Sequence, residues 1–92
     1  MEKNKLALIT GASNGIGYEL SKIFARNGYN LILVARGEEK LQETKDHLAE
    51  YKSEVITYSA DLSNYEEITN LKQWIDENDI KIDVLVLNAG RG

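Results

Sequence analysis

Four short apolar runs alternate with stretches of helical pattern, and this alternation restricts the fold more than any other feature of the chain. The runs span residues 6–10, 30–35, 55–59 and 82–88. Strands that alternate with helices are typical of βαβ units and a parallel sheet. The first, second and fourth runs are almost continuously apolar, as expected of strands that helices cover on both faces. The sequence therefore predicts an α/β fold.

The stretches between these runs carry apolar residues at the spacing of a helix face. In the first stretch the repeating residues are Ile16, Leu20, Ile23, Phe24 and Asn27, and Gly28 follows as a typical helix stop. In the second, from residue 38 to about residue 52, they are Leu41, Leu48 and Tyr51. These patterns predict two helices, the second with a narrow buried stripe.

A third helix is expected to end near Asn78, with Ile68, Leu71 and Ile75 on its inner face. Ser63, followed three residues later by Glu66, matches a capping box that would begin this helix. Trp74 lies beside the inner face, so we interpret it as a packing residue rather than a platform for a ligand.

Right-handed crossovers would arrange the four strands in the order 3-2-1-4. Helices one and two would then cover one face of the sheet and helix three the other. This is half of a doubly wound Rossmann fold. At 92 residues the chain is long enough for one domain only, so we expect a single truncated dinucleotide-binding domain over residues 1–92.

Composition excludes several classes of function. Eleven Lys and Arg stand against fifteen Asp and Glu, a net charge of −4, and no basic stripe suggests a nucleic-acid partner. The apolar runs are far too short to span a membrane, and the start MEKNK lacks the apolar core of a signal peptide, so we expect a cytoplasmic protein. The chain has no Cys, and its one His, His47, is interpreted as a solvated helix residue, so no metal site is expected.

The turn between the first strand and the first helix carries the strongest functional signal. Residues 10–17 read TGASNGIG, and we call this segment the glycine turn. Gly11 would permit the tight turn, Gly15 the close approach of phosphates and Gly17 the packing of helix against strand. Amides at the start of the helix would then face a bound anion. The turn predicts a pyrophosphate site, although a glycine-rich loop alone is weak evidence.

The spacing of the glycines separates this turn from other nucleotide-binding loops. It reads G-x-x-x-G-x-G, which differs from the G-x-G-x-x-G fingerprint. It also lacks the Lys-Ser/Thr pair of a P-loop, which excludes a Walker nucleotide site.

The glycine turn resembles the TGxxxGIG motif of the short-chain dehydrogenase/reductase family letter for letter. The resemblance continues in register over all 92 residues, through the end of the second strand at Arg36 and through Asp61-Leu62 after the third. The fourth run ends in Asn88-Ala89-Gly90, similar to the family's NNAG motif with Leu87 in place of the first Asn. Methyltransferases and nucleotide-sugar epimerases, other Rossmann-like classes, fit the glycine spacing less well.

The residue after the second strand indicates which dinucleotide is preferred. An acid near that strand end selects NAD through the ribose 2′-hydroxyl, whereas this chain has Ala35 and then Arg36. A guanidinium can pair with a 2′-phosphate, so we expect NADP(H) to be favoured over NAD(H). Ser13 and Asn14 could add hydrogen bonds to the same phosphate, although the family often has a basic residue at the position of Asn14. The alternative for Arg36 is a solvated loop cation.

The resemblance implies further contacts with the dinucleotide. Asp61 would bind the adenine amino group with the Leu62 amide beside it, or would instead cap the loop into helix three. Asn88, Ala89 and Gly90 would line the ribose, and Asn88 would also tie neighbouring strands together. The expected cofactor-binding residues are Gly11, Ser13, Asn14, Gly15, Ile16, Gly17, Arg36, Asp61, Leu62, Asn88, Ala89 and Gly90.

Family members reduce carbonyls or oxidise alcohols with a Tyr, a Lys four residues later, a Ser and an Asn, all downstream of the NAG motif. We therefore expect no catalytic residue in this chain, and none of its five tyrosines is expected to take that role. The favoured interpretation is the NADP(H)-binding part of an oxidoreductase whose substrate is not readable here. The alternative is a non-catalytic nucleotide-binding module, or one that self-associates through the fourth strand, which would be an exposed sheet edge.

Overall fold

The fold was analysed in a computed structural model that describes residues 5–13 and 15–88. The elements in chain order are β1 (Leu6–Thr10), α1 (Gly15–Arg26), β2 (Asn30–Ala35), α2 (Glu38–His47), β3 (Val55–Ser59), α3 (Tyr65–Glu77) and β4 (Val84–Val86). A short 3-10 segment, Leu48–Glu50, extends α2. All strand pairs are parallel, and the sheet has the order β3-β2-β1-β4, so the predicted topology is confirmed.

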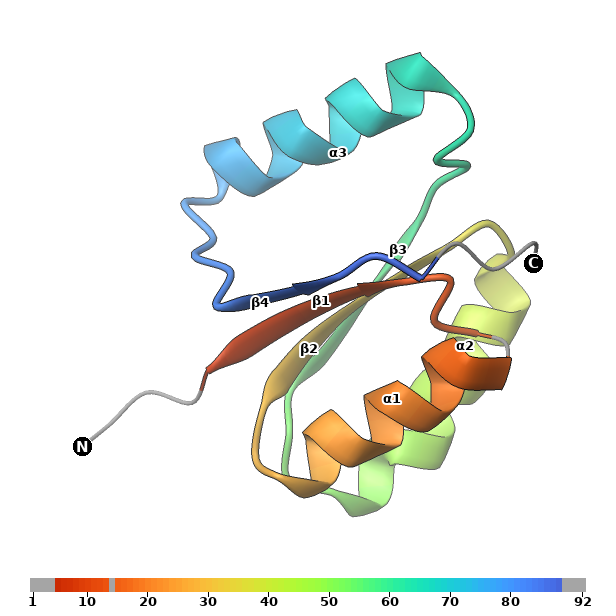
Figure 1. The fold of residues 1–92 in the computed structure, drawn as a ribbon, viewed down its shortest axis with the longest axis vertical. Helices are drawn as coiled ribbons and strands as arrows, with labels where there is room; N and C mark the ends of the chain where they lie inside the picture. Colours follow the sequence, from red (N-terminus) through yellow and green to blue (C-terminus); the bar gives the residue numbers. More distant parts are fainter. Residues whose placement is uncertain (1–4, 14, 89–92) are drawn as a thin grey trace.

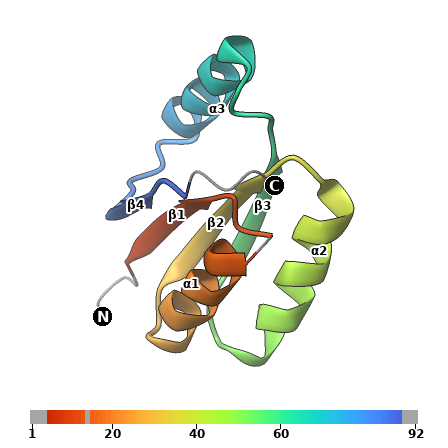
Figure 2. The ribbon, with the colours of Figure 1, turned by 45° about the vertical axis from the view of Figure 1, so that its right-hand side comes forward.

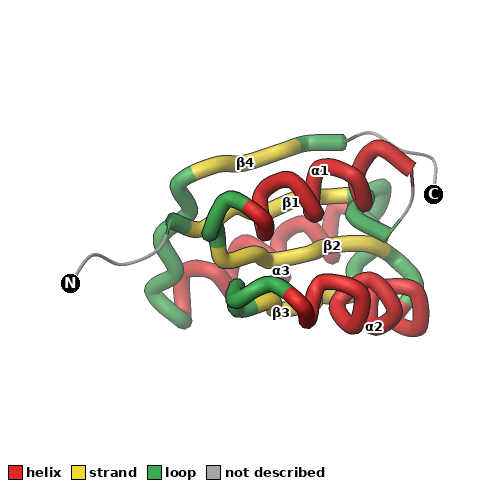
Figure 3. Tube along the Cα trace, turned by 90° about the horizontal axis from the view of Figure 1, so that it is seen from below, coloured by secondary structure: helices red, strands yellow, loops and turns green. Residues whose placement is uncertain are grey.

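The sheet separates α1 and α2 from α3 (Figure 1), as predicted, and the turned view shows the same three layers (Figure 2). Seen from below, the strands run side by side with α1 and α2 on the near face and α3 behind them (Figure 3). One hydrophobic cluster lies between the sheet and α1 and α2, and it includes Ile9, Leu33 and Leu41. The other lies under α3 and includes Leu8, Ile32 and Leu71. Adjacent strand residues point to opposite faces, so β1 and β2 must be apolar at nearly every position.

The face of α1 that packs on the sheet differs in part from the predicted one. Its buried residues are Gly17, Ser21 and Ala25, whereas Ile16 is 70% exposed and Ile23 45%. Small side chains let the helix approach the strands closely, and the hydroxyl of Ser21 donates to the Gly17 carbonyl oxygen at 2.8 Å, which satisfies it inside the helix. Of the predicted stripe, Phe24 does pack against the core cluster under α1, so the large apolar residues lie on both sides of the buried small ones.

The start of α3 also corrects the prediction, because Ser63 and Glu66 do not form a capping box. The N-cap is Asn64, whose side-chain oxygen accepts from the amide of Glu66 at 2.9 Å and from that of Glu67 at 3.4 Å. The Ser63 hydroxyl instead donates to Asp61. Asn ranks at the top of N-cap residues, and its competition with Ser63 one position earlier decides where the helix begins.

Strand β4 is shorter than the predicted run of residues 82–88 and forms an outer strand of the sheet. It pairs with β1 through three residues only, Ala7 with Val84 to Ile9 with Val86. Leu85 is 57% exposed and Leu87 73%. Leu85 lies on β4 and Leu87 just beyond it, so apolar side chains are exposed along this outer edge of the described part of the chain. Within that part, no helix is both long enough and apolar enough to cross a membrane.

The cap of α3 gives a test of this description. Asn64→Ala removes the acceptor for two amides at the start of the helix, so we expect the free energy of unfolding to fall by about 1 kcal/mol. Urea denaturation followed by circular dichroism measures the change. Asn70→Ala, at an exposed site in the same helix, is the matched control and should change stability by less than about 0.5 kcal/mol. Equal effects of the two substitutions would contradict the assignment of Asn64 as the cap.

Candidate dinucleotide site

The parallel sheet brings the predicted site residues to one edge. In the register, Thr10 pairs with Val34 and Val34 with Tyr58, so β1, β2 and β3 end side by side. The glycine turn follows β1, Arg36 follows β2 and Asp61 follows β3, while Asn88 lies beyond β4. In open α/β sheets, ligands bind outside the carboxyl ends of the strands, where the strand order reverses. Here that reversal lies between β1 and β4.

The ends of β1 and β4 are joined by Thr10 and Asn88. The Thr10 hydroxyl oxygen accepts from the Asn88 amide at 2.9 Å and lies 3.4 Å from the carbonyl oxygens of Val86 and Asn88, to either of which it can donate. The Asn88 side-chain nitrogen donates to the Gly11 carbonyl oxygen at 3.3 Å. Asn88 therefore ties the two strand ends together, which is the structural role expected for it. Thr10 was not among the predicted site residues, although it opens the motif.

The glycine turn has no room for side chains at two of its positions. Gly11 has φ of 61°, and a Cβ there would lie 2.9 Å from the Asn88 carbonyl oxygen. A Cβ on Gly17 would clash with the Gly11 carbonyl oxygen and lie 2.8 Å from the Asn88 side-chain nitrogen. Gly17 thus lets α1 pack directly against the turn, as the sequence predicted. By contrast, nothing lies within 4 Å of a Cβ built on Gly15.

The start of α1 has the charge distribution of an anion site. Among the described residues, the first turn of α1 has no acid, whereas α2 begins with Glu38 and Glu39 and α3 carries Glu66 and Glu67. Those carboxylates complement the positive ends of their own helices. At α1 the open side of Gly15 leaves room for a phosphate to take that place. The residues present therefore fit the pyrophosphate of a dinucleotide.

Arg36 is exposed directly after β2. Its backbone carbonyl oxygen accepts from the Ser59 hydroxyl at 2.7 Å, and the neighbouring Ala35 carbonyl accepts from the Ala60 amide at 2.9 Å. The end of β3 therefore holds the backbone of the residue expected to select the 2′-phosphate. The sequence prediction missed Ser59. Only the pairing register could have indicated Ser59, because Ala35 and Ser59 are partners only if β2 and β3 are parallel neighbours.

Asp61 makes the loop contacts that the sequence left as one of two alternatives. Its Oδ1 accepts from the Ser63 hydroxyl at 2.6 Å and from the Ser63 amide at 3.0 Å. These hydrogen bonds, helped by the charge of Arg36, hold the pKa of the Asp61 carboxyl below its usual value against a smaller opposing effect of burial. The carboxylate is therefore ionised at neutral pH and acts only as an acceptor. Its contact with adenine stays a prediction.

The other predicted residues differ in how they are placed. Ser13 and Leu62 are half-buried, and Ile16 is exposed beside the turn. Asn14, Ala89 and Gly90 lie outside the described residues. His47 is exposed, as expected, and its ring lies 6.0 Å from that of Tyr18. Within residues 5–13 and 15–88, no group of three or more His, Cys, Asp or Glu could hold a metal ion.

Tyr18 and Lys22 have the four-residue spacing of the family's catalytic pair. Spacing alone therefore does not exclude Tyr18 as a catalytic residue, and its contacts must decide. The Lys22 ammonium lies over the Tyr18 ring, 5.2 Å from its centroid, and also pairs with Glu19 at 3.4 Å. A cation over the ring face forms a cation–π contact. On α1, Lys22 thus pairs with Glu19, and the Tyr18 ring lies beside that of His47 in α2. We assign the two residues no catalytic role.

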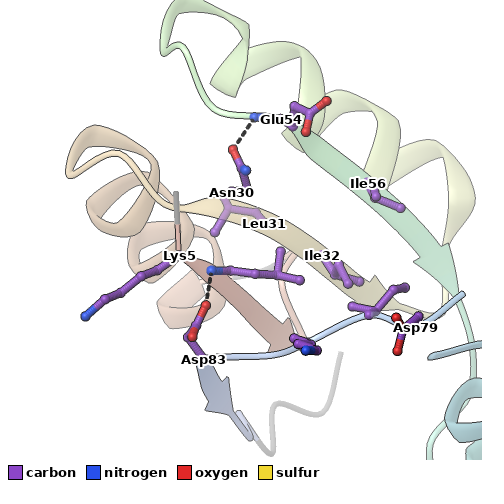
Figure 4. A pocket seen from close by; sticks show the side chains of 11 residues that line it. Lys5, Asn30, Leu31, Ile32, Glu54, Ile56, Asp79 and Asp83 are labelled. Atoms are coloured by element: carbon purple, nitrogen blue, oxygen red, sulfur yellow. Dashed lines mark hydrogen bonds between the residues drawn. The ribbon is translucent and has the colours of Figure 1, made fainter. Parts of the chain in front are cut away.

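A pocket of about 520 Å³ lies at the opposite edge of the sheet, at the amino ends of the strands (Figure 4). Its polar groups hold these ends together: the Leu6 amide donates to Asp83 at 2.8 Å, and the Glu54 amide donates to Asn30 at 2.9 Å. The lining also includes the apolar residues Ile32 and Ile56. Because phosphate-binding turns lie at the other edge, this pocket is separate from the candidate dinucleotide site.

A family model described as short chain dehydrogenase matches residues 5–92. The chain belongs to the short-chain dehydrogenase/reductase family. Among its curated relatives, the fatty acyl-CoA reductase of Acinetobacter baylyi is 39% identical over 89 residues, which are 97% of this chain and 30% of that protein. The NADPH-dependent 1-acyldihydroxyacetone phosphate reductase of Saccharomyces cerevisiae is 37% identical over 92 residues, again 30% of its length. The chain thus spans about a third of the length of these relatives.

Solved structures of the family share the fold closely. Actinorhodin polyketide ketoreductase with NADPH superposes with a TM-score of 0.85 at 36% identity, covering 99% of this chain and 36% of that one. L-sorbose reductase from Gluconobacter frateurii, complexed with NADPH and L-sorbose, superposes with a TM-score of 0.87 at 32% identity, covering 98% and 35%. The predicted half-sheet of the short-chain dehydrogenase/reductase fold is confirmed.

The hydrogen bond that joins β1 and β4 can be tested directly. Thr10→Val keeps the shape of the side chain, which is only 6% exposed, but leaves the Asn88 amide without its acceptor. We expect the free energy of unfolding to fall by about 1–3 kcal/mol in urea titrations. Thr69→Val is the control, because the exposed Thr69 hydroxyl donates to the Tyr65 carbonyl oxygen within helix α3. A loss at Thr10 no larger than at Thr69 would show that the hydroxyl does not hold the strand ends.

Proposed function

We propose that this chain binds NADP(H) at the carboxyl edge of its sheet, as the first part of an oxidoreductase that reduces a carbonyl or oxidises an alcohol. The glycine turn carries the proposal, because Gly17 packs against Gly11 and brings the acid-free start of α1 to the edge where Arg36 lies. Residues 1–92 would form the cofactor-binding portion of a larger domain. The NADPH named in relatives and solved structures of the family supports this choice of cofactor.

In this proposal each part of the dinucleotide has its own residues. Gly11, Gly15, Ile16 and Gly17 surround the pyrophosphate. Arg36 pairs with the 2′-phosphate and Ser13 and Asn14 add hydrogen bonds to it, while Asp61 and Leu62 bind the adenine. Asn88, with Ala89 and Gly90 beyond it, lies along the ribose. A 2′-phosphate is a dianion that a guanidinium binds through two hydrogen bonds, whereas NAD(H) has only a hydroxyl there.

The chemistry of the proposed oxidoreductase needs a longer chain. Hydride transfer requires the nicotinamide, the substrate and a proton donor to be held together. The relatives extend over about three times the length of this chain, and we assign the reacting groups to sequence that they have beyond the matched portion. The substrate would be a carbonyl compound or an alcohol that binds there.

Substitution of Arg36 tests the cofactor preference. In Arg36→Asp the repulsion between a carboxylate and the 2′-phosphate should weaken NADPH binding at least tenfold, since a charged hydrogen bond is worth about 1.5–3 kcal/mol. NADH binding should stay unchanged or strengthen. Isothermal titration calorimetry of both nucleotides measures the shift. Lys52→Asp makes the same change of net charge at the far edge of the sheet and should alter neither constant. Equal NADPH affinities for wild type and Arg36→Asp would refute the assignment.

A second candidate function is self-association through β4, which the exposure of Leu85 on this outer strand and of Leu87 just after it favours. An outer strand offers backbone groups to another strand, and apolar side chains on it favour pairing. In this candidate the chain is a non-catalytic module that pairs with a second copy.

Light scattering over a range of concentrations tests this candidate. The wild-type chain should show a mass above that of the monomer at high concentration, and Leu85→Lys should return it to the monomer. Ile56→Lys places the same charge on β3, the other outer strand, and should leave association in place. A monodisperse wild-type monomer at high concentration would exclude the second candidate.

A further inference from the structure

Glu67 makes a hydrogen bond that its place in α3 does not require. As the third residue of the helix, it is where an acid usually accepts from the amide of the N-cap residue. Here the N-cap amide, that of Asn64, already donates to the Asp61 carbonyl oxygen at 3.0 Å. Glu67 therefore reaches further back, and its Oε1 accepts from the Asp61 amide at 2.7 Å in a partly buried setting. Glu67 thus fixes the backbone of Asp61 instead of capping the helix.

Asp61 is held at its amide, its carbonyl and one oxygen of its carboxylate. Glu67 takes the amide, Asn64 the carbonyl and Ser63 the side-chain Oδ1 through two donors. Both hydrogen bonds found for the carboxylate therefore fall on Oδ1. Oδ2 keeps its capacity to accept, and its direction is set by the bonds to the rest of the residue.

We propose that Glu67 is a positioning residue that makes the site selective for a 6-aminopurine, by fixing Asp61 so that Oδ2 meets the exocyclic amino group of the base. This inference rests on the proposed function, since it concerns the adenine end of the same dinucleotide. Glu67 itself does not touch the nucleotide. It acts through the Asp61 amide, while the carboxylate of Asp61 reads the base.

The selectivity follows from the chemistry of the purine 6-position. Adenine presents an amino donor there, and an ionised carboxylate is an acceptor, so the two groups pair. Hypoxanthine presents a carbonyl oxygen at the same place, which would set two acceptors against each other. A site built to hydrogen-bond one group rejects an analogue that lacks it, because its own polar group is left unpaired. The rejection requires that Asp61 cannot turn away. Ser63 holds its carboxylate, and Glu67 fixes the backbone amide beside it, so that the held side chain keeps its place at the site.

The neighbouring acid provides a matched control. Glu66 lies in the same first turn of α3, and its side chain is exposed. Both acids complement the positive end of the helix, so a loss that merely reflects helix stability would follow removal of either. Only Glu67 accepts from Asp61.

The test compares dissociation constants for NADPH and for its hypoxanthine analogue, measured by calorimetry. Wild type should favour NADPH by about tenfold or more, the equivalent of one charged hydrogen bond. In Glu67→Ala the ratio should fall to about threefold or less, whereas Glu67→Gln, which keeps an acceptor for the Asp61 amide, and Glu66→Ala should keep the wild-type ratio. Glu67→Asp retains the charge at the helix start but is too short to reach Asp61. It should lose selectivity even if Glu67→Ala fails to fold.

The outcomes separate the inference from the proposed function. If wild type binds neither dinucleotide, the proposed function fails and this inference falls with it. If wild type binds both with equal affinity, or if Glu67→Ala and Glu67→Asp keep the wild-type ratio, dinucleotide binding stands and the role of Glu67 is overturned. Trp74 lies in α3, and its ring centroid is 4.9 Å from that of Tyr58 in β3. Its fluorescence therefore checks that each variant keeps this helix packed on the sheet.

Discussion

The contact between Gly17 and the Gly11 carbonyl is the constraint on which the rest of the site depends. A single Cβ at residue 17 would meet both that carbonyl oxygen and the side chain of Asn88. Because the helix can come so close, Asn88 can reach Gly11 and bind Thr10 at the same time. The start of α1 and the ends of β1 and β4 thus form one packed unit. A larger residue would move the helix, and the amides proposed to face the phosphates would move with it.

The sequence was sufficient for the architecture because the two strands at the centre of the sheet are apolar on both faces. Leu31, Ile32, Leu33 and Val34 are all fully buried, so their pattern could only be that of a strand covered by two layers. Strand order then followed from the hand of the crossovers. The motif residues also came together as expected, since parallel strands end at a common edge. These predictions depend on local pattern and chirality, both of which the chain itself carries.

The predictions failed where two local solutions compete or where small residues do the packing. Ser63 and Asn64 both suit an N-cap, and the choice depends on Asp61, which engages Ser63 and leaves the cap to Asn64. On α1, the predicted Phe24 packs against the core, but Ile16 and Ile23 are exposed and full burial falls on Gly17, Ser21 and Ala25. Ser59 and Glu67 were missed for another reason. Their partners, Arg36 and Asp61, are recognised only when the register of β2 and β3 and the course of the loop are known.

The three helix starts show how the fold reserves one place for an external anion. At α3 the side chains of Asn64 and Glu67 accept the nearby amides, and at α2 two glutamates lie in the first turn. At α1 the described first turn has no acid, and the space beside Gly15 is open. Carboxylates of the chain complement the positive ends of α2 and α3, whereas at α1 a bound anion would take that role. Since Arg36 and the ionised Asp61 follow the next two strands, the charge at this edge is arranged along a line: positive at the helix start and at Arg36, negative where a base would bring an amino group. That order of charge fits the proposed dinucleotide, with its pyrophosphate at the helix start and a further phosphate at Arg36, and it arises from residues that the parallel strands alone bring together.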